Sequence, residues 1–278
     1  MTLIVGIWTE NGVVLASDSA ASYSTGQFTT TIGQQEVTKI HKLADSILFA
    51  STGAIGMAQL ISQRLAEMWK KSELAGISSP EEMMLRISGQ IDALVSPFLK
   101  SSNYLRPLGL DPGGSLCKCL VAIPVKQRAH LLSFDYNGAP ERATGELPFM
   151  AMGSGQPIAD PFLALLKRLF WSASPPTLPE ARLAAVWTID HVRRTNPGGV
   201  ALRTQLAVLQ SREGKLEAVL CPENDIQEHM QKIGDAEKAL VEDVRGNRRG
   251  SAHTAAPPLP PPVPQAGNPD KTGVSGVN

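Results

Sequence analysis

A threonine stands directly after the initiator methionine, at the start of the stretch MTLIVGIWTENGVVLASDSAAS. Threonine is a weak nucleophile unless a base lies beside it, and an N-terminal amine is one base that enzymes use. Removal of Met1 would give Thr2 a free α-amine with an ordinary pKa of about 7.7–8.0. A nearby lysine would lower that pKa, because like charges disfavour protonation. Thr2 is therefore a candidate nucleophile that carries its own base.

The position of Thr2 also has a simpler explanation, because small residues commonly follow an initiator methionine that is removed. The surrounding elements have to decide between the two interpretations. Residues 3–9 and 13–17 predict two strands joined at Asn11-Gly12, a pair typical of tight hairpins. Residues 37–43 and 46–52 predict a second hairpin, which follows a polar stretch. Thr2 would thus directly precede the first of these strands.

The rest of the chain predicts helices and strands in alternating groups. Ser79-Pro80-Glu81-Glu82 is typical of a helix start, and this helix is expected to bury an apolar stripe that ends at Phe98. The order of four strands, two helices, four strands, two helices and two strands is neither an alternating βαβ pattern nor all-β. We therefore predict an α+β fold of four layers, an αββα sandwich. The remaining predicted elements are a helix from residue 54, the stripe Met84, Ile87, Ile91, Leu94 and Phe98, a loop over 100–114, strands at 117–124, 130–134, 140–144 and 148–152, helices from Pro157 and from the capping box of Thr177, and strands at 204–210 and 216–221.

Charge and composition exclude several classes of function. Lysine plus arginine equals aspartate plus glutamate, at 26 each, so no net field favours nucleic acid or an acidic membrane surface. The start has no basic segment typical of a signal peptide, and no apolar run approaches the ~20 residues of a membrane span. We expect a cytoplasmic protein that binds neither nucleic acid nor a membrane.

Two cysteines lie two residues apart in the predicted strand SLCKCLVAIPV. Strand alternation places Cys117 and Cys119 on the same face. Core packing is favoured over a metal site, because the other ligands that zinc would need are absent from this stretch. We expect no metal and no cofactor.

The composition changes towards the C-terminus. We divide the chain into a domain over residues 1–222, an amphipathic helix over 223–245 and a tail over 246–278. The tail is rich in proline and poor in core-forming residues, so it is expected to be disordered. Its prolines could instead dock into an aromatic groove of a partner.

Several motifs resemble those of proteasome β-subunits and their bacterial relatives, which include the HslV peptidase and a betaproteobacterial proteasome homologue, the closest in kind. The similarity extends over about residues 2–220. The matching motifs are Thr2-Leu3-Ile4-Val5-Gly6, Gly12-Val13-Val14-Leu15-Ala16-Ser17-Asp18-Ser19, Lys39-Ile40-His41-Lys42-Leu43, Gly53-Ala54-Ile55-Gly56-Met57-Ala58-Gln59 and Gly153-Ser154-Gly155. The resemblance implies the N-terminal-nucleophile hydrolase fold of a proteasome subunit.

The resemblance also implies a role for five residues. Thr2 would be the nucleophile, and Lys39 would lie beside it and lower its pKa. Asp18 would balance the charge of Lys39. The backbone N–H of Gly53 would help to form an oxyanion hole, and Ser154 would hydrogen-bond the terminal amine.

The same register implies a substrate pocket beside the threonine. Its lining would be small and mildly polar, so the resemblance implies no cleavage preference. His41 has two interpretations, as a strand histidine that is exposed or hydrogen-bonded and as a functional contact. The implied lining residues are Ala21, Val37, His41, Ser51 and Ile55.

One loop departs from the family pattern. Many members carry R-D-x-x-S-G-G after the fourth helix, where the aspartate and serine support the nucleophile. The corresponding stretch here is Arg193-Arg194-Thr195-Asn196-Pro197-Gly198-Gly199. Arg194 would replace the aspartate and Pro197 the serine.

Three functions remain open on these residues. The leading hypothesis is a threonine peptidase that cleaves polypeptides inside homo-oligomeric rings stacked in pairs, as the resemblance implies. A partner ATPase that unfolds substrates is compatible with this, although we recognise no docking motif for one. The alternatives are a ring scaffold without catalytic activity, which the altered loop favours, and an amidase that acts on small amides.

Overall fold

The computed structural model describes residues 2–24, 31–105, 116–196 and 200–251. The first sheet has five antiparallel strands in the order β10-β1-β2-β11-β12. The predicted hairpin at Asn11-Gly12 is present, with Thr9 opposite Gly12. A Cβ at Gly12 would lie 2.4 Å from the backbone oxygen of Leu209 on β11, so the close approach of that strand requires glycine here. The strands are β1 (Ile4–Thr9), β2 (Gly12–Asp18), β10 (Phe149–Met152), β11 (Thr204–Arg212) and β12 (Lys215–Leu220).

The second sheet is also antiparallel and has five strands, in the order β5-β6-β7-β8-β9. Cys117 and Cys119 lie on β7 and are buried in the apolar cluster on the outer face of this sheet, which agrees with core packing. The strands are β5 (Ile40–Ala44), β6 (Ile47–Gly53), β7 (Cys117–Val125), β8 (Arg128–Phe134) and β9 (Pro140–Arg142).

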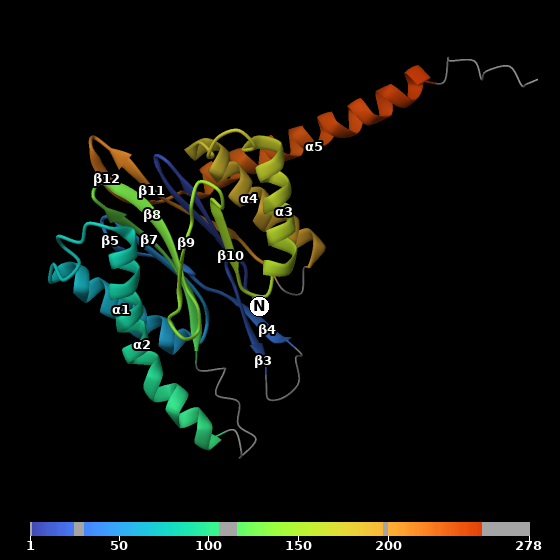
Figure 1. Ribbon diagram of the computed structural model, residues 1–278. Helices are drawn as coiled ribbons and strands as arrows, with labels where there is room; N and C mark the ends of the chain where they lie inside the picture. The colour runs from blue at the N-terminus through green and yellow to red at the C-terminus, as the bar shows by residue number, and fades with distance from the viewer. Residues whose placement is uncertain (1, 25–30, 106–115, 197–199, 252–278) are drawn as a thin grey trace, which may run out of the picture. The chain divides into compact units, whose positions relative to one another are not determined.

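Helices cover the outer faces of both sheets, and the predicted αββα sandwich is confirmed (Figure 1). An apolar cluster that includes Leu15, Leu48 and Leu131 fills the space between the two sheets. A second cluster joins α1 and α2 to the second sheet, and a third joins α3 and α4 to the first. The helices are α1 (Ile55–Lys70), α2 (Pro80–Leu105), α3 (Gln156–Phe170), α4 (Leu178–Thr195) and α5 (Glu223–Ser251).

Both predicted helix caps are present. The Thr177 hydroxyl accepts the N–H of Glu180, and the Glu180 carboxylate accepts the N–H of Thr177, which completes the capping box. The Ser79 hydroxyl accepts the N–H of Glu82 over 3.1 Å. These bonds satisfy N–H groups that have no partner within a helix.

Three predictions of local structure were wrong. A two-stranded ribbon, β3 (Ala20–Ser24) and β4 (Thr31–Glu36), occupies a stretch in which no strand was predicted, because its polar residues lack the apolar alternation that indicates a half-buried strand. The predicted loop over 100–114 is helical as far as Leu105, and residues 106–115 lie outside the described part. The buried stripe of α2 ends at Val95, so Phe98 is exposed; its members are Met83, Ile87, Ile91 and Val95.

The helix α5 begins at Glu223, where the sequence predicted the main domain to end, and continues past the second predicted boundary at residue 245. Ile226 and Ile233 are buried in the cluster of the first sheet. By compactness the chain divides after Gly234, into units Met1–Gly234 and Asp235–Asn278. The predicted division at 222 and 245 stays a prediction, and residues 252–278, which make up most of the predicted tail, lie outside the described residues. Within the described part, no helix is long and apolar enough to cross a membrane.

Candidate active site

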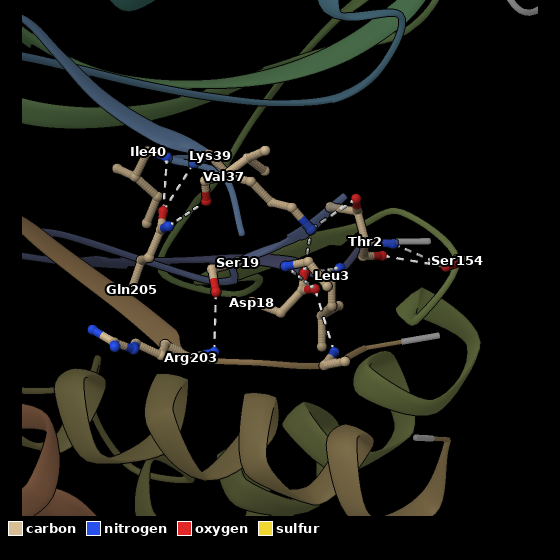
Figure 2. Close-up of polar contacts among 12 residues, drawn as sticks. Thr2, Leu3, Asp18, Ser19, Val37, Lys39, Ile40, Ser154, Arg203 and Gln205 are labelled. Atoms are coloured by element: carbon tan, nitrogen blue, oxygen red, sulfur yellow. Dashed lines mark hydrogen bonds and ion pairs between the residues drawn. The ribbon is translucent and has the colours of Figure 1, made fainter. Parts of the chain in front are cut away.

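Thr2, Lys39 and Asp18 meet at one end of the first sheet (Figure 2). The Lys39 Nζ donates to Thr2 Oγ1 over 3.0 Å and to Asp18 Oδ1 over 2.7 Å. Thr2 immediately precedes β1 and Asp18 ends β2, so the pairing of these two strands brings them together. Lys39 directly precedes β5 and reaches them from the second sheet.

Asp18 is a buried carboxylate with several backbone donors around it. Its Oδ1 accepts the N–H of Leu3 over 2.9 Å, and its Oδ2 accepts the N–H groups of Ala20 and Ala201 over 3.2 and 3.4 Å. Only 1% of the Asp18 side chain and 7% of the Lys39 side chain are exposed. A buried ion pair needs such additional hydrogen bonds to offset its lost hydration, and Asp18 accepts three of them from backbone N–H groups.

The electrostatics of Lys39 suit the activation of a neighbouring hydroxyl. Burial lowers the pKa of Lys39 below its ordinary value, while the charge of Asp18 and its hydrogen bond to the ammonium oppose that shift. A charge-assisted hydrogen bond from the ammonium to Thr2 Oγ1 favours the developing alkoxide. The pair therefore places a positive charge where a threonine nucleophile needs one.

Ser154 lies on the other side of Thr2. The Thr2 N–H donates to Ser154 Oγ over 3.1 Å, and the Gly155 N–H donates to the Thr2 carbonyl over 3.2 Å. Gly153 has a φ of 99°, and a Cβ at this position would lie 2.2 Å from the Thr2 carbonyl oxygen. Glycine is thus required for the loop after β10 to lie against the backbone of Thr2.

Replacing Gly153 with alanine is expected to destabilise the protein and to displace Thr2 from Ser154, because the new methyl group collides with backbone. Gly76→Ala is the matched control, since Gly76 also has a positive φ, of 79°, but a methyl group added there would meet no atom within 4 Å. The control is expected to lose only about 1–2 kcal/mol of unfolding free energy to backbone strain. Denaturant unfolding of both variants measures the difference, and equal losses would contradict the packing argument.

A cavity of about 670 Å³ opens beside Thr2. All five residues predicted to line a substrate pocket lie in its wall, which combines apolar and polar side chains. Burial lowers the pKa of His41 below its ordinary value of 6.5, against an opposing hydrogen bond with the Thr38 backbone, so the imidazole is mainly neutral at neutral pH. The lining residues are Thr2, Ala21, Val37, Thr38, Lys39, His41, Phe49, Ser51, Thr52, Gly53, Ile55, Ala58, Gln59, Ser62 and Ser154.

Gly53 lies in the wall of this cavity, at the end of β6. It has a φ of 112°, and a Cβ there would lie 2.4 Å from the backbone oxygen of Leu116. The following residue, Ala54, donates its N–H to that same oxygen. Glycine is therefore required for β6 to end this close to the backbone that precedes β7.

Sequence reasoning missed Gln205 on β11. Its Oε1 accepts the N–H of Lys39 over 2.9 Å and that of Ile40 over 3.3 Å, and its Nε2 donates to the Val37 carbonyl over 2.7 Å. A signal for it existed, because strand alternation in TQLAVLQ places Gln205 on the same face as Ala207, which is buried between the sheets. A polar residue in such a row of apolar positions indicates a specific hydrogen-bonding partner.

The loop that departs from the family pattern is organised by a buried aspartate. Asp190, with 2% of its side chain exposed, pairs with Arg193 over 2.6 Å and with Arg194 over 2.7 Å. Arg193 also donates to the carbonyl of Leu202 over 3.1 Å. Residues 197–199, including Pro197, lie outside the described residues. Beyond them the chain reaches Asp18 through the backbone N–H of Ala201.

Known proteins resemble this chain in sequence. The model of a family described as proteasome subunit matches residues 2–174. A curated protein named proteasome subunit beta, from Ferroglobus placidus, is 30% identical over 158 residues, which make up 57% of this chain. The match covers 65% of that relative, slightly less than two thirds of its length.

Solved structures resemble it in fold. Anbu (ancestral beta-subunit) from Yersinia bercovieri has a TM-score of 0.61 and 15% identity, with 93% of this chain and 100% of that chain covered. Anbu from Hyphomicrobium sp. strain MC1 has a TM-score of 0.58 and 15% identity, with 86% and 97% covered. At this level of identity the two structures show the fold alone.

Proposed function

This chain belongs to the proteasome subunit family, and on that basis we propose that it is a threonine peptidase whose nucleophile is the Thr2 hydroxyl. The observation that carries the proposal is the contact of 3.0 Å between Lys39 Nζ and Thr2 Oγ1 in the wall of a cavity. The α-amine of Thr2, freed by removal of Met1, is the proposed base. Its pKa would be lowered by the neighbouring ammonium, which leaves more of it neutral.

The proposed reaction proceeds through an acyl-enzyme. The α-amine accepts the proton of the Thr2 hydroxyl as Oγ1 attacks the peptide carbonyl carbon. The oxyanion of the tetrahedral intermediate would accept a hydrogen bond from the Gly53 N–H, and losing one such donor typically costs about 10²–10³ in rate. The protonated amine then gives its proton to the leaving amine. Water attacks the resulting ester by the same route and releases the carboxylic acid and the free hydroxyl.

Asp18 and Ser154 have supporting roles in this proposal. Asp18 keeps Lys39 charged although burial lowers the lysine pKa. The Ser154 hydroxyl lies 3.1 Å from the nitrogen that becomes the terminal amine, so it would orient the base. Ala21, Val37, His41, Ser51 and Ile55 would contact the substrate side chain, because they line the cavity beside the nucleophile.

We further propose that the subunits assemble into homo-oligomeric stacked rings whose chamber admits unfolded polypeptides. A ring scaffold without catalytic activity is the second candidate. The observation that favours it is the ion pair of Arg194 with Asp190, since Arg194 occupies the position matched to an aspartate that supports the nucleophile elsewhere in the family. An amidase for small amides is also compatible with a cavity of about 670 Å³, a volume within the range of small-molecule sites.

Labelling of Thr2 tests the proposal directly. Intact-mass analysis of the native protein is expected to show a chain that is lighter by one methionine residue. A peptide boronate or epoxyketone is expected to form an adduct that peptide mapping locates on Thr2. Retained Met1 with no adduct would support the scaffold, whereas an adduct on Thr2 with hydrolysis of small amides but not of peptides would support the amidase.

A further inference from the structure

We propose that Gln205 is a positioning residue of this active site. Its side chain holds the segment Val37–Ile40 so that Lys39 reaches Thr2. The inference rests on the proposed function. Gln205 lies on β11 in the first sheet, and its side chain crosses to the segment that leads into β5 of the second sheet (Figure 2). It is therefore a hydrogen-bonded link between the two sheets at the site.

The link uses both ends of the side-chain amide. The oxygen accepts two N–H groups, from Lys39 and Ile40, and the nitrogen donates to the Val37 carbonyl. Val37–Lys39 lies between β4 and β5, and backbone groups at such a junction need hydrogen-bond partners outside the regular ladders. The amide of Gln205 supplies these partners in the way that a peptide group of a neighbouring strand would.

The position of Gln205 on β11 relates it to Asp18 as well. On β2, the strand paired with β11, Asp18 lies opposite Thr204 and Ser17 lies opposite Gln205. Strand β11 therefore positions Asp18 through its backbone pairing with β2. It positions the backbone of Lys39 through the side chain of Gln205. The 2.7 Å ion pair of Lys39 with Asp18 depends on both.

The held segment also forms part of the cavity wall. Val37, Thr38 and Lys39 all line the cavity, and His41 follows two residues later on β5. A displacement of this segment would move both the ammonium beside Thr2 and the surface that contacts a substrate side chain. A misplacement of about 1 Å in a catalytic site can cost about 10²-fold in rate.

The chemistry of glutamine is specific to this role. Methionine has a similar length but offers no N–H donor and only a weak acceptor, so Gln205→Met would leave two N–H groups and one carbonyl without their partner. Glutamate keeps the acceptor for Lys39 and Ile40 but loses the donor for Val37. Gln205→Glu should therefore retain part of the function that Gln205→Met loses.

The test compares Gln205→Met with Gln210→Met in the full-length protein. Gln210 is a matched control on the same strand, where it accepts a hydrogen bond from Arg182 over 3.1 Å and lies away from Lys39. Gln205→Met is expected to slow both peptide hydrolysis and labelling of Thr2 by about 10²-fold, with partial recovery in Gln205→Glu. Gln210→Met is expected to leave both rates unchanged.

Two further measurements separate positioning from general damage to the fold. Hydrogen exchange at the amides of Lys39 and Ile40 is expected to accelerate in Gln205→Met and not in Gln210→Met. The pH dependence of Thr2 labelling is expected to shift in Gln205→Met, because the ammonium of Lys39 is displaced from its position beside Thr2. Slower labelling with an unchanged pH profile and unchanged exchange would overturn the inference.

The proposed function and this inference can fail separately. If wild-type protein neither hydrolyses peptides nor reacts at Thr2, the peptidase proposal fails. In that case hydrogen exchange still tests whether Gln205 holds Lys39 and Ile40, and equal protection in Gln205→Met and in wild type would overturn the inference. An active wild type with a fully active Gln205→Met variant would overturn the inference while leaving the peptidase proposal intact.

Discussion

Replacing Thr2 with alanine is expected to abolish peptide hydrolysis and to leave the fold in place. The variant keeps the α-amine, Lys39 and the cavity but has no hydroxyl to attack the substrate. Removing the nucleophile of a hydrolase whose groups act as a unit typically costs on the order of 10⁶-fold in turnover. The effect on stability should be small, because the side chain of Thr2 accepts a single hydrogen bond, from Lys39 Nζ. Initial rates with a fluorogenic peptide, together with denaturant unfolding, measure both results.

Two variants sharpen this experiment. Thr2→Ser retains a hydroxyl at the same place and should keep part of the activity. Thr144→Ala removes the hydroxyl of a threonine outside the cavity lining, where it accepts the N–H of Leu147, and should leave turnover unchanged. If Thr2→Ala keeps wild-type activity, the chemistry lies elsewhere, and the hydroxyls of Ser51, Thr52 and Ser62 in the same cavity become the candidates.

Most of the fold could be predicted because most elements carried a local signal for their buried face. The hairpin at Asn11-Gly12, the capping box of Thr177 and the apolar periodicities were sufficient for the αββα sandwich, which is confirmed. The ribbon β3–β4 was missed because its sequence has no apolar alternation, so its strands are defined by pairing with each other. The buried stripe of α2 ends at Val95, one turn earlier than predicted. The prediction was wrong because periodicity alone does not show where the sheet beneath a helix ends.

The candidate site depended more on motif resemblance than on physical pattern. The match of a proteasome subunit model to residues 2–174 confirms the family, while the roles of Thr2, Asp18 and Lys39 stay predictions. Thr2 and Asp18 meet because their strands pair, and the Lys39 side chain extends to them from the second sheet. Hydrophobic periodicity predicts neither of these arrangements. Strand alternation marks Gln205 as a polar residue in a buried row, but its partner Lys39 lies 166 residues away in the chain and cannot be identified from that pattern.

The buried ion pair gives the second large prediction. Asp18→Asn is expected to destabilise the protein by about 3–5 kcal/mol, because it leaves the buried ammonium of Lys39 without an opposite charge. Asparagine also replaces one carboxylate oxygen with an NH₂ donor. The backbone N–H groups of Leu3, Ala20 and Ala201 donate to the two carboxylate oxygens in the wild type, so at least one of them would lose its acceptor. Denaturant unfolding at neutral pH measures the loss. Glu217→Gln, which breaks the exposed pair of Glu217 with Arg212, should change stability by no more than about 1 kcal/mol.

The pH dependence of the unfolding free energy tests whether the buried charge of Lys39 causes the loss of stability in Asp18→Asn. Burial lowers the pKa of Lys39 below 10.5 in the folded protein, so between that lowered pKa and 10.5 the unfolded chain binds more protons and stability rises with pH. In Asp18→Asn the carboxylate charge that raises the pKa of Lys39 is gone, so the pKa of Lys39 in the folded variant falls further. The loss of unfolding free energy in Asp18→Asn should therefore shrink as pH is raised from neutral towards 10. The double variant Asp18→Asn with Lys39→Met has no ammonium to neutralise and should lack this recovery. A deficit that stays the same at every pH, or that the double variant shares in full, would show that lost hydrogen bonds rather than the buried charge account for it.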